Sequence, residues 1–408
     1  MTDPAAALAH CLRRDRGRIL AALIARVQDF QLAEDALQDA CVSALIHWGR
    51  AGPPHRPEPW LIRAAFRKAI DRLRGAARDS RQTAALSQLA RDEAADDPAS
   101  IPDERLRLIF TCCHPALEEK SRCALTLRIV CSLTTAEIAA AFLDTEPTMG
   151  QRISRAKARI AALNLRFDLP DPADWPERLC SVLTVIYLIF TTGHTQSNTT
   201  LCQEAIFLAR LLQDLLPNDP ETQACLALML FAHARAAARA PNGQTIPPEA
   251  QDRSLWNANE ITEALTLLNA AISQSRPGPM QLKAAIAAAH ILPSSPDWPQ
   301  IEALYARLLE LEPTPVVALN HAVALAETGQ AAQALRLLEA LAEPLASYQP
   351  YHAALAHLLA LTANHPAAHA AYTRAIALAE NLADAAFLAE RRKNLLDAQA
   401  VSKITPET

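Results

Sequence analysis

The stretch SLTTAEIAAAFLDTEPTMGQRISRAKARIAAL, residues 132–163, decides the fold of the N-terminal part of this chain. It reads as two short helices joined by a tight connection. Thr134 is expected to cap the first helix, with Glu137 three residues later completing a capping box. The second helix is expected to begin near Thr145 or Glu146, because Pro147 then falls in the first turn, where proline is favoured.

The second helix of this pair has an apolar face and polar faces. The apolar stripe consists of Met149, Ile153, Ala156, Ile160 and Leu163. The other faces carry Thr148, Gln151, Arg152, Arg155, Lys157 and Arg159. A helix that is held by its apolar side and offers guanidinium and amide groups outward suits the major groove of DNA. The alternative interpretation is a solvated basic face without a role in DNA binding.

The composition favours closely packed helices. Half of the 408 residues are apolar, only 5% are aromatic, and alanine is abundant. Segments with the β-branched alternation of strands are rare, so the chain is expected to be all-α. The charge is uneven, since residues 1–163 carry a net +4 and residues 164–408 a net −9. Only the N-terminal part therefore suits a polyanion.

The sequence also argues against several classes of protein. The first 18 residues hold no apolar core of signal-peptide length and no window suits a membrane span, which predicts a cytoplasmic protein without membrane contact. Nine irregularly spaced cysteines indicate reduced thiols. No second ligand pair follows Cys112, Cys113 and His114 at finger spacing, so no metal is expected. Without a glycine-rich phosphate loop or a nucleophile elbow, no enzyme, catalytic residue or cofactor is expected.

Two amphipathic helices are expected at the start of the chain. The helix over residues 8–28 would bury Leu12, Ile19, Leu23 and Val27 and expose Arg13, Arg14, Arg16 and Arg18. The helix over residues 32–48 would bury Ala33, Leu37, Cys41, Ala44, Leu45 and Trp48. Its opposite face is acidic and polar, with Glu34, Asp35, Gln38 and Asp39. An acidic face on a basic domain is better placed for a basic protein partner than for DNA.

A proline-rich loop over residues 49–59 is expected to precede a basic helix over residues 60–74. That helix carries Trp60, Arg63, Arg67, Lys68 and Arg74. A tryptophan beside cations suits separated DNA strands, where bases stack and phosphates meet positive charge. A packed tryptophan with a solvated basic face is the alternative. An acidic linker with Asp92, Glu93, Asp96 and Asp97 follows, and then two helices over residues 103–113 and 118–131.

In this order and spacing, the blocks WLIRAAFRKAIDRLR, DERLRLIFTCCHPAL and LTTAEIAAAFLDTEPTMGQRISRAKARI resemble an extracytoplasmic-function sigma factor of the sigma-70 family. The resemblance covers about the first 165 residues, and DERLRLIFTCCHP is similar to the subgroup with a long helical extension. It implies that residues 29–39 grip the clamp helices of the largest subunit of core RNA polymerase, through Asp29, Glu34, Asp35, Gln38 and Asp39. It also implies that residues 49–74 open and read the minus-ten element and that residues 146–159 read the minus-thirty-five element.

The C-terminal part is a succession of helices that ends in repeats. Its most apolar segment, residues 174–190, leads into Thr191-Thr192-Gly193-His194, where similar proteins read closer to Phe-Asn-Glu-Gly-Tyr. Ala334, Leu338 and Leu341 recur 34 residues later as Ala368, Tyr372 and Ala375, and Ile301, Tyr305 and Leu308 precede them by 33. This period predicts tetratricopeptide-like repeats, whose concave surface suits a protein or peptide partner. Opposite net charges alternatively favour docking of this part on the N-terminal domains.

The expected domains are therefore a sigma domain two (1–75), a linker (76–102), a sigma domain four with a helix-turn-helix (103–167), a helical extension (168–290) and tetratricopeptide-like repeats (291–400). The favoured function is a sigma factor that binds core RNA polymerase and promoter DNA, with a regulatory extension. Two alternatives are a one-component helix-turn-helix regulator with a ligand- or peptide-sensing repeat domain, and a scaffold protein. Neither alternative needs the acidic helix followed by the Trp60 helix, which favours the sigma factor.

Overall fold

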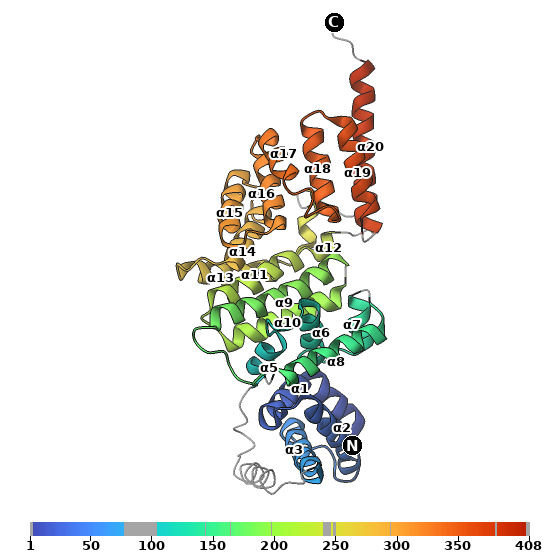
Figure 1. Ribbon diagram of the computed structural model, residues 1–408, viewed down its shortest axis with the longest axis vertical. Coiled ribbons are helices and arrows are strands. Elements are labelled where there is room, and N and C mark those ends of the chain that lie inside the picture. Colours follow the sequence, from blue (N-terminus) through green and yellow to red (C-terminus); the bar gives the residue numbers. More distant parts are fainter. Residues whose placement is uncertain are drawn as a thin grey trace. The chain divides into compact units, whose positions relative to one another are not determined.

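The computed structural model describes residues 3–76, 104–142, 144–163, 165–196, 198–239, 246–247, 250–293, 295–379 and 382–404. Within these ranges every regular element is a helix, which confirms the expected all-α class (Figure 1). The chain divides into two compact units, Met1–Thr192 and Gly193–Thr408. The predicted acidic linker lies outside the described residues, apart from Ala76 at the end of a helix.

Three helices form what we call the first bundle: α1 (Pro4–Val27), α2 (Phe30–Ala51) and α3 (Pro57–Ala76). Each packs against the other two (Figure 1). Their core contains Ile19, Leu23, Leu37, Trp48 and Ile62, each at most 3% exposed. Burial of such side chains contributes about 1.5–3 kcal/mol each, so this core is what holds the polar faces in place.

Several side chains of the first bundle lie where the sequence did not place them. Arg18, expected to point outward, is half-buried and pairs with Glu58 of α3. Leu45, expected in the core, is 44% exposed, because the buried stripe of α2 runs through Ala33, Ala40 and Ala44 and leaves Leu45 outside its edge. Arg16, expected to point outward, has a side chain that is only 20% exposed and contacts a carboxylate.

The proline-rich loop is shorter than expected. It spans residues 52–56, because α2 continues to Ala51 and α3 begins at Pro57. Gly52 ends α2 with φ at +79° and donates its amide to the Trp48 carbonyl at 2.9 Å. Pro57 is tolerated in α3 because the first-turn amides of a helix have no intrahelical acceptor.

Four further helices form the second bundle: α5 (Arg105–Cys112), α6 (Glu119–Ile129), α7 (Thr135–Ala141) and α8 (Glu146–Ala162). The predicted capping box is confirmed, since Thr134 Oγ1 accepts from the Glu137 amide at 3.2 Å and the Glu137 carboxylate accepts from the Thr134 amide at 2.7 Å. Of the predicted apolar stripe of α8, four members are buried. Leu163 is 38% exposed, because α8 has ended one residue before it.

Helix α9 (Trp175–Thr195) begins the extension and packs on the second bundle. Arg178 Nη2 donates to the Phe110 carbonyl at 2.8 Å, and Ser181 Oγ donates to the Cys113 carbonyl at 2.6 Å. The Trp175 ring lies 5.0 Å from that of Phe110. The first part of the extension is therefore built into the unit that carries the second bundle, although the domain bounds given above stay predictions.

The second unit contains the remaining helices. They are α10 (Thr199–Leu215), α11 (Pro220–His233), α12 (Ala236–Arg239), the 3-10 turn η2 (Arg253–Leu255), α13 (Ala258–Ser273), α14 (Pro279–Ile291), α15 (Trp298–Leu311), α16 (Pro315–Glu327), α17 (Ala331–Glu339), α18 (Gln349–Leu361), α19 (His365–Ala377) and α20 (Leu382–Ile404). None of the helices in the described ranges is long and apolar enough to cross a membrane.

The helices from α14 to α19 confirm the predicted tetratricopeptide-like repeats. Consecutive helices pack as antiparallel pairs, including α16 on α17 and α18 on α19. The repeated positions occupy equivalent places on α15, α17 and α19, where Ile301, Ala334 and Ala368 are each fully buried. Gly329 has φ at +90° in the turn between α16 and α17, a backbone conformation that favours glycine.

Candidate functional site

Four of the six predicted DNA-reading residues form one exposed stripe on α8. They are Thr148, Gln151, Arg155 and Arg159, spaced so that consecutive members lie about one turn apart. Among the described residues, neither Arg155 nor Arg159 pairs with a carboxylate. The buried side of the same helix is the apolar stripe that begins at Met149. This exposed stripe has the composition and spacing of a groove-reading surface.

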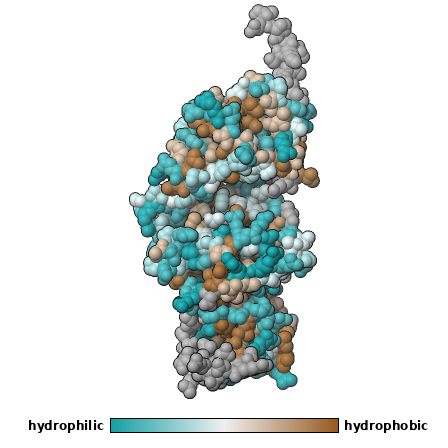
Figure 2. Space-filling model, viewed as in Figure 1, coloured by the Kyte–Doolittle hydropathy of each residue, from teal (hydrophilic) through white to brown (hydrophobic). Residues whose placement is uncertain are grey.

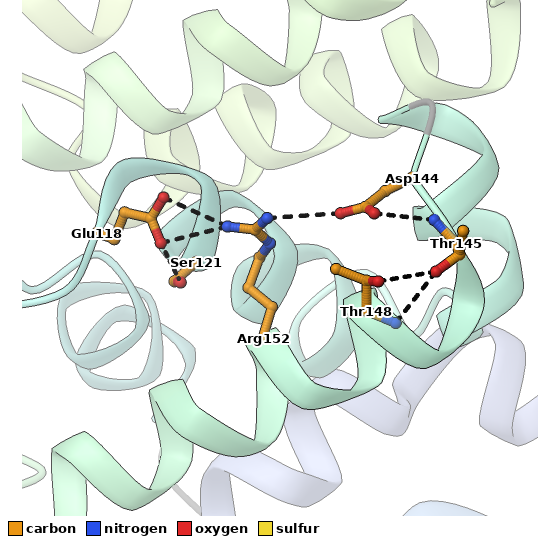
Figure 3. A network of polar contacts seen from close by, with 6 residues as sticks. All are labelled: Glu118, Ser121, Asp144, Thr145, Thr148 and Arg152. Carbon is orange, nitrogen blue, oxygen red and sulfur yellow. Dashed lines mark hydrogen bonds and ion pairs between the residues drawn. The ribbon is translucent and has the colours of Figure 1, made fainter.

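Arg152, the fifth predicted residue, is engaged within the second bundle (Figure 3). Its Nη1 lies 3.2 Å from Glu118 Oε2, and its Nη2 lies 3.5 Å from Asp144 Oδ2. Asp144 also accepts from the Thr145 amide at 2.9 Å, at the N-terminus of α8. The Arg152 side chain is only 20% exposed. Arg152 thus ties the start of α6 to the turn between α7 and α8, and its predicted DNA contact stays a prediction.

These contacts predict that Arg152→Ala destabilises the second bundle. The substitution leaves the partly buried Asp144 without its cation, and an unpaired buried charge costs about 1–3 kcal/mol or more. We expect a lower midpoint in thermal unfolding followed by circular dichroism. Arg155→Ala, on the same helix but without an ion-pair partner among the described residues, is the matched control and should leave the midpoint unchanged. Equal midpoints for the two variants would contradict a structural role for Arg152.

Lys157, the sixth predicted residue, reaches the first bundle. Its Nζ forms an ion pair with Glu34 of α2, and the two side chains are 18% and 13% exposed. Glu34 also meets Arg16 Nη2 at 3.5 Å. A residue predicted to bind DNA and a residue predicted to bind polymerase therefore contact each other in this structure.

The other predicted polymerase-contacting residues all lie at or near the first half of α2. Asp29 caps the helix by accepting from the Leu32 amide at 2.9 Å. Asp35 and Asp39 accept from Arg72 of α3 at 3.0 and 2.7 Å, on a surface where all three side chains are about two-fifths exposed. Exposed ion pairs of this kind contribute little to stability, so a partner can replace Arg72 at small cost. Gln38 is exposed beside them.

An exposed apolar cluster follows on the same helix, and sequence reasoning missed it. Val42, Leu45 and Ile46 are 55%, 44% and 56% exposed, and we call them the α2 apolar cluster. Figure 2 shows hydrophobic surface over the place that α2 occupies in Figure 1. The sequence did contain a signal for this cluster. Val42 lies one turn after Gln38 and Ile46 lies two turns after it, so both fall on the polar side of the helix. Contiguous exposed apolar side chains mark interaction surfaces.

The predicted minus-ten residues lie along α3. Trp60 is half-buried, stacks on His47 with ring centroids 5.8 Å apart, and meets the buried Trp48 edge-on at 5.4 Å. Arg63, Arg67 and Arg74 are exposed and share one side of the helix, whereas Lys68 is half-buried. The contacts with His47 and Trp48 bury Trp60 only in part. The rest of Trp60 is accessible on the helix that carries the exposed arginines.

The cysteines of the second bundle are packing residues. Cys112 and Cys113 are buried, and burial raises the pKa of the Cys113 thiol to about 11 and that of Cys123 to about 12. These thiols stay protonated at neutral pH, which makes them poor nucleophiles and poor metal ligands. The described part of the chain contains no group of three side chains that could hold a metal ion.

Both bundles match known protein families. Residues 11–79 match Sigma-70 region 2, residues 107–160 match Sigma-70 region 4, and residues 178–272 match a family of unknown function. A protein of Rhizobium meliloti (strain 1021), itself described as uncharacterized, is 43% identical over 392 residues, which cover 91% of this chain and 92% of the relative. The crystal structure of yeast Tom70 aligns with 96% of this chain and 85% of its own at 14% identity, with a TM-score of 0.37.

The matches agree with the geometry of the first unit. The first bundle corresponds to region 2 and the second to region 4, and the two regions imply binding of core RNA polymerase and promoter DNA. The exposed cationic stripe of α8 falls within the region 4 match. The chain belongs to the sigma-70 family, as an extracytoplasmic-function sigma factor that carries a helical, tetratricopeptide-like C-terminal extension.

Proposed function

We propose that this sigma factor binds core RNA polymerase through α2, reads promoter DNA through α3 and α8, and needs its helical extension for full transcription activity. The observation that carries the proposal is the pairing of two chemically different exposed faces in one unit. Helix α2 presents an apolar cluster beside carboxylates, and α8 presents an exposed cationic stripe that has no ion-pair partner in the described part of the chain. A protein partner suits the first face and a nucleic acid suits the second.

The α2 face has the anatomy of a protein interface. Its centre is the α2 apolar cluster, and its polar edge is Gln38, Asp39 and Asp35. Stable interfaces commonly have an apolar centre and a polar rim, with the rim setting orientation and the rate of encounter. The partner that fits is therefore a surface with apolar side chains and neighbouring cations.

The α3 and α8 faces suit different parts of promoter recognition. On α8, Gln151 and the two unpaired arginines are able to make bidentate contacts with base edges in a major groove. On α3, the accessible part of Trp60 provides a surface for stacking an unpaired base, and the flanking arginines provide cations for phosphates. This arrangement supports duplex reading by α8 and strand-opened reading by α3.

The extension is tied to region 4 through α9, and this motivates a prediction for truncation. A chain ending after Asp171 loses α9 and uncovers Phe110 and Cys113, whereas a chain ending after Gln196 retains it. We expect both truncated chains to bind core polymerase through region 2 and to transcribe poorly. The shorter one should also unfold at lower temperature, because the Trp175 ring and the Arg178 and Ser181 hydrogen bonds are gone.

Run-off transcription with purified core polymerase on a genomic fragment library tests the proposed function. The full chain should give discrete transcripts from a subset of fragments, and the chain ending after Gln196 should give weaker transcripts from the same subset. A truncated chain that is more active than the full chain would show that the extension is inhibitory. Absence of any transcript from a full chain that is folded and bound to the polymerase would contradict promoter recognition.

A further inference from the structure

A small polar cavity lies at the start of the second unit. It has a volume of about 100 Å³ and is formed by the last turn of α9, the first turn of α10, the end of α11 and the short helix α12. One water needs roughly 10–15 Å³ of such space, so the cavity has room for a small ligand. Thr199 and Ala236 line the cavity and are exposed, which makes it accessible from solvent.

The walls of this cavity are fixed by close backbone contacts. A Cβ added to Gly193 of α9 would lie 2.9 Å from the Cys202 amide nitrogen and 3.0 Å from Leu201 Cβ, so α10 approaches α9 this closely only because residue 193 is glycine. The Gly193 carbonyl accepts from the Asn198 amide at 2.8 Å. The Asn198 side chain in turn caps α10 by accepting from the Leu201 amide at 3.1 Å. The cavity is therefore formed before any ligand binds, which favours binding.

The groups that line the cavity give it a positive charge. Burial, together with the charges of two nearby arginines, lowers the pKa of His194 to about 4, and burial raises the pKa of the Cys202 thiol to about 11. Both side chains are therefore neutral at pH 7. His233 is paired with Glu260 at 2.9 Å. Arg239 donates to the His194 carbonyl and keeps its charge, and none of the lining residues that the structure describes is acidic.

A second arginine adds its charge from behind the lining. Arg235 lies four positions before Arg239 and 6.0 Å from the Trp256 ring, and its Nε and Nη1 are buried without an acceptor among the described residues. Burial lowers the pKa of Arg235, and the charge of Arg239 lowers it further, so two like charges are held close together. Asp384 opposes the effect of the arginines on His194 only in part. Two guanidiniums thus outweigh the nearby carboxylate.

We propose that this cavity binds a small oxyanion, a phosphate or a carboxylate group, through Arg239 and the polar side chains of Asn198 and Thr199, with Arg235 supplying further charge. Desolvated cations are unfavourable without a counter-ion, and a bound anion removes that cost. Water fills the same space but does not neutralise the two guanidiniums. The proposal does not depend on the roles of α2, α3 and α8.

Substitutions on α12 test the site without changing its backbone walls. Ala236 lines the cavity and Ala237 does not, although both are exposed. Successive positions of a helix point about 100° apart, so Ala236→Glu directs a carboxylate toward the cavity and Ala237→Glu directs one away from it. The two variants have the same net charge, which makes Ala237→Glu the matched control. Circular dichroism checks that both keep wild-type helicity.

Isothermal titration of the full-length chain with inorganic phosphate and with acetate, at an ionic strength kept constant with chloride, measures the binding. We expect saturable binding of at least one of the two oxyanions by the wild type and by Ala237→Glu. Ala236→Glu should bind about tenfold to a hundredfold more weakly, because repulsion replaces charged hydrogen bonds. Binding of phosphate alone points to a phosphorylated ligand, and binding of acetate points to a carboxylate.

Arg235→Met decides the matter if Ala236→Glu fails to fold. It should weaken oxyanion binding severalfold without lowering the thermal midpoint of the free chain, because the buried Nε and Nη1 make no hydrogen bond that the substitution could break. Absence of saturable binding of both oxyanions would overturn the proposal. So would undiminished affinity in Ala236→Glu or in a folded Arg235→Met, since the anion would then bind elsewhere, for example on the cationic faces of α3 and α8.

Discussion

Replacing both Val42 and Ile46 by glutamate is expected to abolish binding of this sigma factor to core RNA polymerase at micromolar concentration. Both side chains are more than half exposed and belong to the α2 apolar cluster, so the substitution leaves the core of the first bundle intact. Central apolar side chains of an interface typically contribute about 2 kcal/mol or more each, and a buried carboxylate without a partner adds a further penalty. The loss should therefore exceed a hundredfold.

A pull-down on immobilised core polymerase, followed by a titration of the Kd, measures this loss. Ile272→Glu on α13 is the matched control, because Ile272 is 52% exposed and lies in the extension. The control should bind like the wild type, and both variants should keep wild-type helicity and thermal midpoint. Undiminished binding by the Val42 and Ile46 variant would move the polymerase interface away from this part of α2.

The features that the sequence predicted well are those set by neighbours along the chain. The capping box at Thr134 and the start of α8 after Thr145 each depend on a few adjacent residues. The helical period likewise placed Met149 and Ile153 in the core. These features form as predicted because no tertiary contact favours a different local structure at these residues.

The features that the sequence did not reveal depend on contacts between distant residues. Lys157 and Glu34 are 123 positions apart, and no local pattern shows that the fold brings them together. The same holds for Arg16, which looks like a solvated residue of an amphipathic helix until α6 and α2 surround it. The prediction that Leu45 is buried was wrong for a different reason. It treated apolar character as a sign of burial, although the side chains of interaction surfaces are also apolar.

The second large effect is expected at α8, where Arg155→Ala combined with Arg159→Ala should remove most promoter-specific transcription. These two side chains are exposed and unpaired within the described structure, so the variant should fold as the wild type does. Each bidentate contact with a base contributes about 1–3 kcal/mol of discrimination, so the loss of two should lower run-off output at least about tenfold. Arg336→Ala combined with Arg374→Ala removes the same charge from exposed positions of the extension and should be neutral.

The salt dependence of promoter binding then distinguishes how each arginine acts. A phosphate contact releases counterions, so its removal weakens binding to every sequence and reduces the salt slope by about one. A base contact leaves the slope nearly unchanged and relaxes the preference at one position of the promoter. Binding of the single variants to matched and mismatched promoter duplexes over a range of salt assigns Arg155 and Arg159 separately. If neither the slope, the specificity nor the transcript changes in the double variant, the exposed stripe of α8 is a solvated face, and promoter reading must lie elsewhere on the chain.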